Sequence, residues 1–346
     1  MFDNLKIIDE KSIVVMPDFS IDRIIRLESQ EQLFSTLSEK TKYGGGSLRG
    51  IPTFDIKGGN AVNVAYCLAK LGAQITLFTI ADEIGSMIIK RVFSKFGNSV
   101  NLRIANGNHG RSTALEFVGG KTSRINLIIS DVGDNVNFGA ERIASTDDME
   151  ILKNTDGVMV VNWASNLKGT ELVEHVFKNS PYAFHFIDPA DIENRREEFR
   201  ITLSKLSDII DVVSLNENEC NSLGRTLGFD SLLPSNNYND NDIKDAAKKL
   251  ADKFGIDIEI HTSKGAAWSN GLETAFSQAV KVEAKTLTGA GDSWDAADII
   301  GYLAGLDAEE RLIYANVCSS LYVRNPHAQP ATMTEVSELL ERIGHK

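Results

Sequence analysis

Short runs of β-branched residues alternate with amphipathic helical stretches along most of this chain, and no other feature restricts the fold as much. Strands that are apolar throughout are buried on both faces. The sequence therefore predicts an α/β fold, with a central, mostly parallel sheet between helical layers. The strand-like runs are SIVVM (12–16), QITLFTI (74–80), GVMVVNW (157–163), AFHFID (183–188), IIDVVSLN (209–216) and IDIEIHT (256–262), and the helical ones are GNAVNVAYCLAKLG (59–72), TELVEHVFKN (170–179) and DIKDAAKKLADKFG (242–255).

Two stretches interrupt this alternation. Residues 103–130 alternate polar and apolar residues around Gly-Gly, which is typical of a half-exposed antiparallel hairpin. Residues 17–57 contain an amphipathic helical stretch, SQEQLFSTLSEK, and a Gly-rich turn. We therefore expect one domain over residues 1–346, with a small β-rich lid made by segments 17–57 and 103–130. The polar, turn-rich segment 228–242 is expected to be a surface loop.

Charge and cysteine content narrow the classes of function. The 36 Lys and Arg residues against 48 Asp and Glu residues give a net charge of −12, which repels nucleic acid and anionic membranes. The sequence has no apolar run of roughly 18 residues, the length that crosses a membrane. Cys67, Cys220 and Cys318 are far apart and lack His at metal-ligand spacing. We expect a cytoplasmic protein with no nucleic-acid or membrane partner.

The most informative motif is T-G-A-G-D, at residues 288–292. Gly289, Ala290 and Gly291 have little or no side chain, so several backbone N–H groups can point at one anion where a helix begins. Asp292 follows directly, and its predicted task is to accept the proton of a hydroxyl that attacks a γ-phosphoryl group. A bare G-x-G-D pattern also fits an N-capping Asp after a Gly turn, so other motifs must decide.

A second motif opens the helical stretch at residue 59. Gly58 and Gly59 precede it, and Asn60 and Asn63 fall on its first turn, where amides can hydrogen-bond substrate hydroxyls. The same stretch also fits the start of a dinucleotide-binding βαβ unit, but the G-x-G-x-x-G spacing is absent.

A third motif ends an apolar strand, in SLNENEC at residues 214–220. Asn216 and Glu219 are three residues apart, and an amide with a carboxylate at the carboxyl end of a strand suits Mg²⁺ held through water. The alternative is an ordinary solvated helix start, where Asn and Glu are common.

Taken together and in this order, G-G-x-x-x-N, N-x-x-E and T-G-A-G-D resemble the ribokinase-like carbohydrate kinases, the PfkB family. The resemblance runs from about residue 12 to about residue 335. It implies a ribokinase-like three-layer sandwich with a small β-rich lid. It also implies ATP- and Mg²⁺-dependent transfer of the γ-phosphoryl group to a hydroxyl of a sugar or sugar-like small molecule.

The resemblance further implies roles for individual residues. Asp292 is the catalytic base, and the anion hole is made by Gly289, Ala290 and Gly291. The substrate contacts are Asp22, Gly58, Gly59 and Asn63. The nucleotide contacts are Asn216, Thr262, Gly265 and Asn316, and the metal-binding residues are Glu219 and Asp188.

Three departures from the family pattern leave details open. Thr286 and Leu287 stand before Thr288 where family members write D-T, which leaves dependence on a monovalent cation open. The loop HTSKGAAW is about two residues short, which leaves the nucleotide preference open. NWASN (162–166) replaces the stretch in which ribokinases offer Glu to the sugar, so ribose itself is not assigned.

The acceptor class is also open among a sugar, a polyol and a nucleoside. A nucleoside kinase shares all three motifs and is the nearest alternative. A non-catalytic ligand-binding or regulatory protein on the same fold is the alternative from another class, and a dinucleotide-dependent oxidoreductase is the weakest. Exposed sheet edges in the lid also favour a homodimer formed through the lid.

Overall fold

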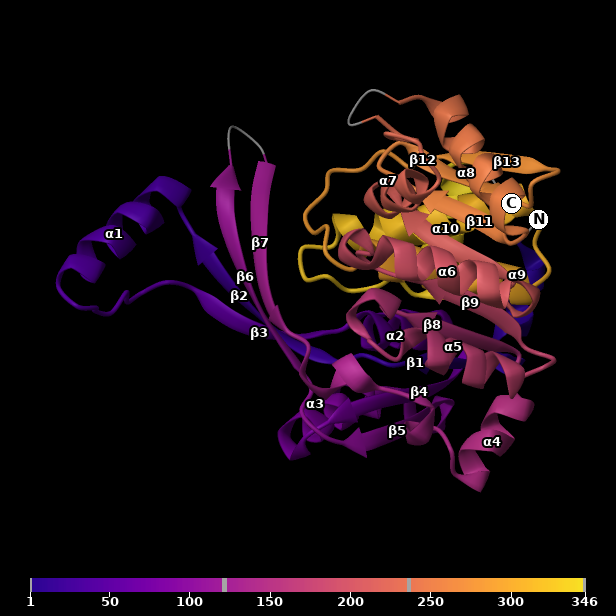
Figure 1. Ribbon diagram of the computed structural model, residues 1–346, viewed down its shortest axis with the longest axis horizontal. Coiled ribbons are helices and arrows are strands. Elements are labelled where there is room, and N and C mark those ends of the chain that lie inside the picture. The colour runs from indigo at the N-terminus through magenta and orange to yellow at the C-terminus, as the bar shows by residue number, and fades with distance from the viewer. Residues whose placement is uncertain (1, 120–122, 235–237, 345–346) are drawn as a thin grey trace.

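A nine-stranded sheet forms the centre of the computed structural model, which describes residues 2–119, 123–234 and 238–344 (Figure 1). Its strands are β1 (Ser12–Met16), β4 (Gln74–Ala81), β5 (Val100–Asn106), β8 (Gly157–Val161), β9 (Phe184–Asp188), β10 (Val212–Asn216), β11 (Asp257–His261), β12 (Gly265–Ser269) and β13 (Thr274–Gln278). The order across the sheet is β13-β12-β11-β10-β9-β8-β1-β4-β5. All neighbours from β11 to β5 are parallel, and β12 and β13 continue the sheet as an antiparallel extension.

Helices cover both faces of this sheet because successive strand residues point to opposite sides. In β1, Ile13 and Val15 join one apolar cluster, while Val14 and Met16 join the other. The first cluster is closed by α2 (Asn60–Leu71), α3 (Glu83–Phe93), α9 (Ala290–Leu303), α10 (Ala308–Arg324) and α11 (Met333–Arg342). The second is closed by α4 (Thr146–Lys153), α5 (Gly169–Lys178), α6 (Arg196–Leu206), α7 (Glu217–Thr226) and α8 (Asp240–Phe254).

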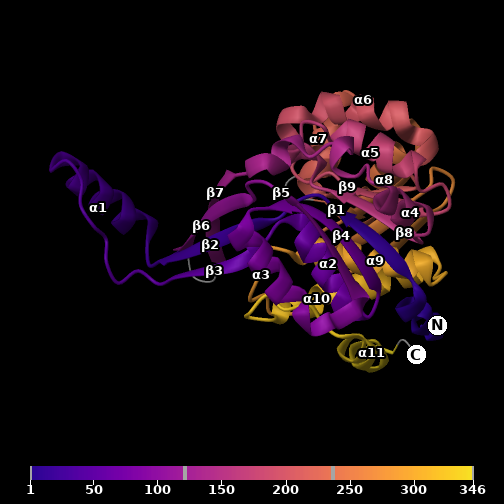
Figure 2. The same cartoon turned by 90° about the horizontal axis from the view of Figure 1, so that it is seen from below.

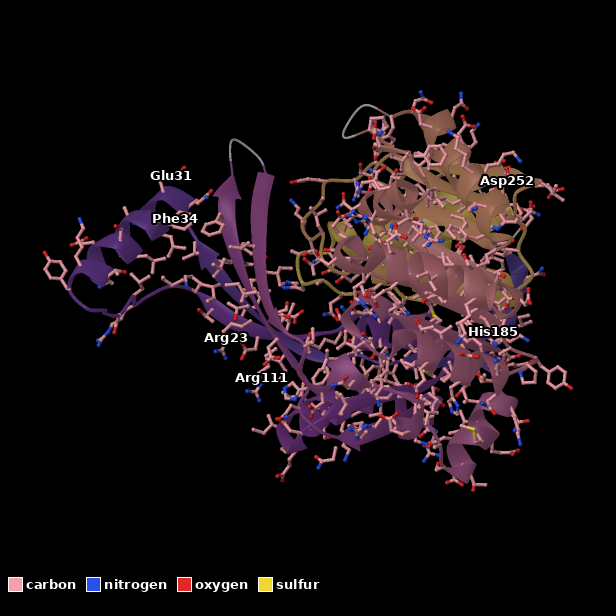
Figure 3. The ribbon with its side chains drawn as sticks, in the orientation of Figure 1. Arg23, Glu31, Phe34, Arg111, His185 and Asp252 are labelled. Atoms are coloured by element: carbon pink, nitrogen blue, oxygen red, sulfur yellow. The ribbon has the colours of Figure 1, made fainter. Side chains whose placement is uncertain are left out.

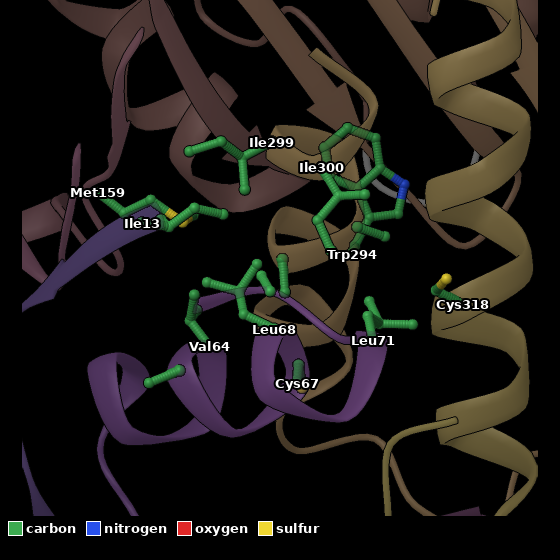
Figure 4. Close-up of a cluster of buried hydrophobic side chains, with 14 of the residues drawn as sticks. Ile13, Val64, Cys67, Leu68, Leu71, Met159, Trp294, Ile299, Ile300 and Cys318 are labelled. Atoms are coloured by element: carbon green, nitrogen blue, oxygen red, sulfur yellow. The ribbon is translucent and has the colours of Figure 1, made fainter. Parts of the chain in front are cut away.

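Helices α2 and α9 pack against each other within the first cluster. Leu68 of α2 and Ile299 of α9 are fully buried, and Trp294 lies beside them with 2% of its surface exposed (Figure 4). The Trp294 indole N–H donates to Asn316 Oδ1 on α10 at 2.9 Å, so its polar atom is satisfied inside the core. The apolar packing of α2 on α9 fixes the two helices relative to each other, and both begin at the site described below.

A four-stranded lid sheet projects from the main body. It has the order β3-β2-β6-β7 and consists of β2 (Ser20–Leu27), β3 (Thr53–Gly58), β6 (Gly110–Gly119) and β7 (Ser123–Asp131). Helix α1 (Gln30–Lys42) connects β2 to β3 and lies at the far end of the lid in both views (Figures 1 and 2). Ser29 caps α1, but the helix has no buried residue, and Phe34 is 55% exposed (Figure 3).

The α/β sandwich predicted from the alternation is confirmed, and two local expectations need correction. Residues 103–106 lie in β5 of the main sheet, so only the later part of segment 103–130 forms the antiparallel hairpin of β6 and β7. Segment 228–242 is only partly a surface loop, because α8 begins at Asp240 and Leu233 is buried. Residues 235–237 lie outside the described residues. No helix in the described ranges is long and apolar enough to cross a membrane.

Candidate active site

Polar side chains from four parts of the chain meet at the carboxyl-terminal edge of the parallel strands. Asp18 follows β1, Asp188 ends β9, and Asn216 ends β10. Asp292 reaches the same place from the first turn of α9. In open α/β sheets, ligands bind outside this edge. A crevice forms there at the point where the strand order reverses.

The Asp292 carboxylate is held by two amides of α2. Asn60 Nδ2 donates to Asp292 Oδ1 at 3.0 Å, and Asn63 Nδ2 donates to Asp292 Oδ2 at 2.9 Å. Residues three apart on a helix lie on the same face, which allows both amides to reach one carboxylate. Asp292 is 6% exposed, so the two bonds fix a buried group at the edge of the crevice.

Free backbone N–H groups lie beside this carboxylate at the start of α9. Ala290 N donates to Leu287 O and Ser293 N donates to Gly289 O, whereas the amides of Gly291 and Asp292 have no acceptor among the described residues. Gly289 has a left-handed φ of 88°, and a Cβ there would lie 2.4 Å from the Tyr322 hydroxyl oxygen. Glycine is therefore required at 289, and two N–H groups remain for an anion.

A pocket of about 250 Å³ opens on the other side of Asn63. Asp22 and Lys57 from the lid, Asn63 from α2, and Thr288 and Tyr322 near α9 are among its lining residues. Asp22 also accepts a hydrogen bond from Ser20 Oγ at 2.7 Å. The pocket therefore lies between the lid and the residues that hold Asp292.

The two glycines before α2 allow a close approach to neighbouring acids. A Cβ on Gly58 would lie 2.1 Å from Asp22 Oδ2, and a Cβ on Gly59 would lie 2.7 Å from the backbone oxygen of Asp18. Since Gly59 carries no cap, the Asp18 carboxylate accepts from the amides of Asn60 and Ala61, each at 2.9 Å. Asp18 therefore caps the N-terminus of α2 in place of residue 59.

Burial and mutual repulsion raise the pKa values of the acids at this edge. Burial, followed by the Asp188 charge, raises the pKa of Asp292 to about 8. The same two causes raise the pKa of Glu219 to about 8, and burial raises that of Asp188 itself to about 6. Burial also raises the pKa of Asp295, one turn along α9 from Asp292. Such a concentration of uncompensated acids is typical of a functional site.

The Asn216–Glu219 pair forms a capping box at the start of α7. Asn216 Oδ1 accepts from the Glu219 amide at 3.1 Å, and Glu219 Oε2 accepts from the Asn216 amide at 2.9 Å. Asn216 Nδ2 also donates to Glu219 Oε1 at 2.7 Å. The hydrogen bonds of this motif are therefore those of an ordinary helix start, the alternative that the sequence left open. Burial and the charge of Asp188 nevertheless raise the pKa of Glu219.

Thr262 and Asn316, two of the expected nucleotide residues, are hydrogen-bonded within the chain. Thr262 Oγ1 accepts from the Gly265 amide at 3.2 Å, and this bond closes the turn between β11 and β12. Asn316 Nδ2 donates to the backbone oxygens of Ser277 and Gln278, each at 3.2 Å. A Cβ on Gly291 would lie 3.3 Å from His261, so the residue before Thr262 adjoins the anion hole.

Sequence reasoning missed Asp18, Lys57 and Asn162 as members of the site. Asn162 Nδ2 donates to Asp18 Oδ2 at 2.9 Å, and Lys57 Nζ donates to Asn63 Oδ1 at 2.6 Å. Each adjoins a segment that the sequence analysis examined: Asp18 stands four residues before Asp22, Lys57 precedes Gly58, and Asn162 opens NWASN. These residues lie in or next to segments that the sequence analysis considered. Their hydrogen-bond partners could not be predicted, because the fold determines which side chains meet.

The sequence matches the family described as "pfkB family carbohydrate kinase" over residues 55–335. This chain belongs to the pfkB family of carbohydrate kinases. Members of this family are phosphotransferases with an alcohol group as acceptor, and the chain is a kinase of this class. A sugar or nucleoside is therefore the general class of acceptor.

Known proteins similar to this pfkB kinase agree with its fold. The ribokinase of Arabidopsis thaliana is 26% identical over 325 residues, which cover 92% of this chain and 78% of the relative. Its structure with ribose and ATP superposes with a TM-score of 0.71 at 22% identity, covering 96% of this chain and 98% of that one. Adenosine kinase from Sinorhizobium meliloti gives a TM-score of 0.70 at 17% identity, covering 96% and 99%.

Proposed function

We propose that this kinase transfers the γ-phosphoryl group of ATP to a hydroxyl of a sugar or sugar-like small molecule, with Asp292 as the general base. One observation carries the proposal: the buried Asp292 carboxylate stands at the start of α9, beside amides of Gly291 and Asp292 that have no acceptor in the described chain. A proton acceptor and an anion site thus adjoin each other, which is the arrangement that in-line phosphoryl transfer requires.

Asp292 keeps capacity for an acceptor hydroxyl while the α2 amides remain bound. Each carboxylate oxygen offers two lone pairs, and Asn60 and Asn63 each occupy one. An incoming hydroxyl can therefore donate to a second lone pair. The raised pKa of Asp292 makes the carboxylate a stronger base than a solvated Asp, so it accepts the hydroxyl proton more readily as the oxygen attacks.

The substrate side of the site is proposed to consist of Asp22, Gly58, Gly59 and Asn63. Asp22 and Asn63 line the pocket and offer carboxylate and amide groups to hydroxyls. The two glycines keep the backbone close to Asp18 and Asp22, because any side chain there would collide with them. In the related Arabidopsis structure the ligands named are ribose and ATP, which supports a sugar acceptor and ATP as donor.

The nucleotide and metal ion are proposed to bind on the opposite side of the anion hole. Asn216, Thr262, Gly265 and Asn316 would surround the nucleotide. The transferring phosphoryl group would lie at the turn of Gly289, Ala290 and Gly291, held by the amides of Gly291 and Asp292, because the Ala290 amide donates to Leu287 O. The carboxylates of Asp188 and Glu219 fit Mg²⁺, a hard cation that prefers oxygen ligands. Bound there, Mg²⁺ would neutralise phosphate charge.

The charges of the two carboxylates support the fit of this ion. Besides burial, the charge of Asp188 raises the pKa of Glu219, so a cation near both carboxylates would offset their repulsion. Mg²⁺ usually keeps several waters and binds through one or two carboxylates together with substrate phosphates.

A nucleoside is the second candidate acceptor. Tyr66, Tyr322 and Gln329 also line the pocket, and aromatic rings with an amide can hold a base by stacking and hydrogen bonding. The adenosine kinase from Sinorhizobium meliloti has the same fold. A non-catalytic ligand-binding protein is disfavoured, because a binder gains nothing from a buried base next to free amides.

The chain is proposed to work as one kinase domain whose segments 17–57 and 103–130 form a lid over the acceptor and exclude water. Homodimerisation through the lid is supported by its uncovered apolar residues, among them Leu127, Ile128 and Ile129 of β7, which are 52%, 51% and 62% exposed. A cytoplasmic location is consistent with three buried free cysteines.

The test is a screen of ATP consumption against sugars, polyols and nucleosides, with Mg²⁺ present. The Asp292→Asn variant is the control. We expect acceptor-dependent ADP formation by the natural chain and its loss in the variant. Equal ADP formation by both proteins would remove Asp292 from the reaction, and dependence on a nucleoside alone would select the second candidate.

A further inference from the structure

Lys57 is a largely enclosed lysine with an unusual set of partners. It lies near the end of β3 and lines the pocket next to Asn63. Its ammonium group donates to Asn63 Oδ1 at 2.6 Å and stands 4.7 Å from the centre of the Tyr66 ring. Among the described residues no carboxylate forms an ion pair with it. Enclosing a lysine without an ion pair costs stability, so its presence calls for a functional explanation.

The bond from Lys57 determines which way the Asn63 amide faces. An ammonium has only donors, so it can be satisfied only by the amide oxygen. With Oδ1 turned to Lys57, Nδ2 is turned to Asp292 Oδ2 at 2.9 Å. If the amide rotated by half a turn, its oxygen would face the carboxylate and repel it. Lys57 therefore excludes the wrong orientation of Asn63.

We propose that Lys57 is a positioning residue of phosphoryl transfer: it orients the Asn63 amide toward Asp292 and supplies a positive charge that favours the ionised form of this base. The inference rests on the proposed function, because it assigns Lys57 a part in the same reaction. It also explains why β3 of the lid carries a charged residue directly before the two glycines that precede α2.

The charges around Asp292 support the second half of the proposal. Lys57 is a cation that acts on the charge of Asp292, and it opposes the effect of burial on the pKa of Asp292. Burial lowers the pKa of Lys57, while Cys67, Asp292 and Asp22 counteract that effect. The other titratable groups near Asp292 are Asp18 after β1, Asp188 at the end of β9, Asp295 on α9, Cys67 on α2 and Tyr322 on α10.

The first experiment needs no substrate. The carboxyl ¹³C signal of Asp292 is followed against pH by NMR in the ligand-free full chain, with Asp292→Asn used to assign it. Burial raises the pKa of Asp292 to about 8, and replacing the ammonium in Lys57→Met should raise it further, because the nearby positive charge is lost. An unchanged Asp292 titration would overturn the proposal.

Lys95→Met is the matched control. Lys95 lies 4.7 Å from the same Tyr66 ring and donates to the Tyr66 hydroxyl at 2.6 Å, but it makes no hydrogen bond to Asn63. It should leave the Asp292 titration where it is. An equal shift in both variants would mean that any lysine near Tyr66 has the effect and would overturn the specific role of Lys57.

The second experiment is kinetic and uses ATP with the acceptor that the screen identifies. In Lys57→Met, kcat/KM near neutral pH should fall about tenfold and recover as the pH rises, whereas Lys57→Arg should restore part of the rate. A loss that is the same at every pH would indicate a merely structural residue and contradict the proposal.

A double variant tests whether Lys57 acts through Asn63. Once Asn63→Ala has removed the amide, adding Lys57→Met should cost less than it does in the natural chain, because the shared contact is already gone. Full additivity of the two losses would overturn the amide-orienting role. A natural chain that consumes no ATP with any acceptor would instead refute the proposed function, and with it the catalytic role, while the NMR result would still report the effect of Lys57 on Asp292.

Discussion

The main body and the lid of this kinase bury their strands to very different degrees. All five residues of β8 are buried, whereas four of the six residues of β3 in the lid are exposed. In β7 the consecutive residues Leu127, Ile128 and Ile129 are all exposed, so neither face of that strand is covered at its centre. The body therefore owes its stability to packing, while the lid is held chiefly by its strand pairing and leaves apolar side chains exposed.

The contrast extends to charged residues. Acids of the body, such as Asp292 and Glu219, are buried and have raised pKa values. The lid acid Asp55 is exposed and forms an ion pair with Arg23 at 2.8 Å, which lowers its pKa. The acids proposed to react thus belong to the body, and among the charged lid residues that the structure describes, Asp22 and Lys57 line the pocket.

The largest expected effect compares one acid from each region. Asp292→Asn should lower kcat at least about 10³-fold, because it removes the base together with its positioning role. Asp55→Asn should change kcat by less than about threefold, since an exposed ion pair contributes little. Steady-state kinetics of both variants would measure this. Similar losses in the two would erase the distinction between body and lid.

A matched pair of leucines tests the difference in packing. Leu215→Ala in β10 should lower the free energy of unfolding by about 3 kcal/mol, because the residue is fully buried. Leu127→Ala in β7, half exposed, should change it by less than about 0.5 kcal/mol. Urea denaturation followed by circular dichroism gives both values. A large cost at Leu127 would show that the lid surface is covered in solution.

The pH dependence of the reaction should follow the buried acids of the body. Asp292, the proposed base, can accept a proton only when ionised, and burial raises its pKa to about 8. Below that pH, kcat/KM should rise about tenfold with each pH unit and then level off. The exposed lid acid Asp55, whose pKa is lowered by its hydrogen bond with Arg23, adds no step in this range. A flat profile between pH 6 and 8 would show that Asp292 is ionised throughout.

The smallest expected effect concerns assembly through the lid. Ile129→Asp should weaken the proposed homodimer about tenfold or more, because it places an unpaired charge on an apolar surface. Thr146→Asp on α4 of the body would be an equally charged control with no effect on assembly. Sedimentation velocity over a range of protein concentrations measures this. A natural chain that stays monomeric at all concentrations would rule the dimer out.

The sequence predicted the body far better than the lid because the two carry different signals. Apolar runs such as GVMVV are buried on both faces, and they identified the parallel strands. In the lid, weak alternation over residues 103–130 did not separate β5 from the hairpin, since residues 103–106 pair with β4 in the main sheet. The short strands β12 and β13 were not predicted, because GAAWS and TAFSQ lack a distinct apolar pattern.

Site prediction was limited in the same way. The residue types around Asp292 and Asn63 could be chosen from local motifs, since each motif occupies a few consecutive positions. The bonds that join motifs could not, because Asn63 and Asp292 are 229 residues apart and meet only through the packing of α2 on α9. Asp18 as a cap for α2 and Lys57 as a partner of Asn63 belong to this second kind of information.

The apolar interface between α2 and α9 has a consequence for evolution and engineering. Asn60 and Asn63 lie on α2, and Asp292 lies on α9. The distances between these three side chains therefore depend on how Leu68, Trp294 and their neighbours pack between the two helices (Figure 4). Random mutagenesis scored for turnover should therefore recover changes deep in this seam. Substitutions at these buried positions would be expected to lower stability. In such variants, however, turnover would change because the distances between the side chains of the site change.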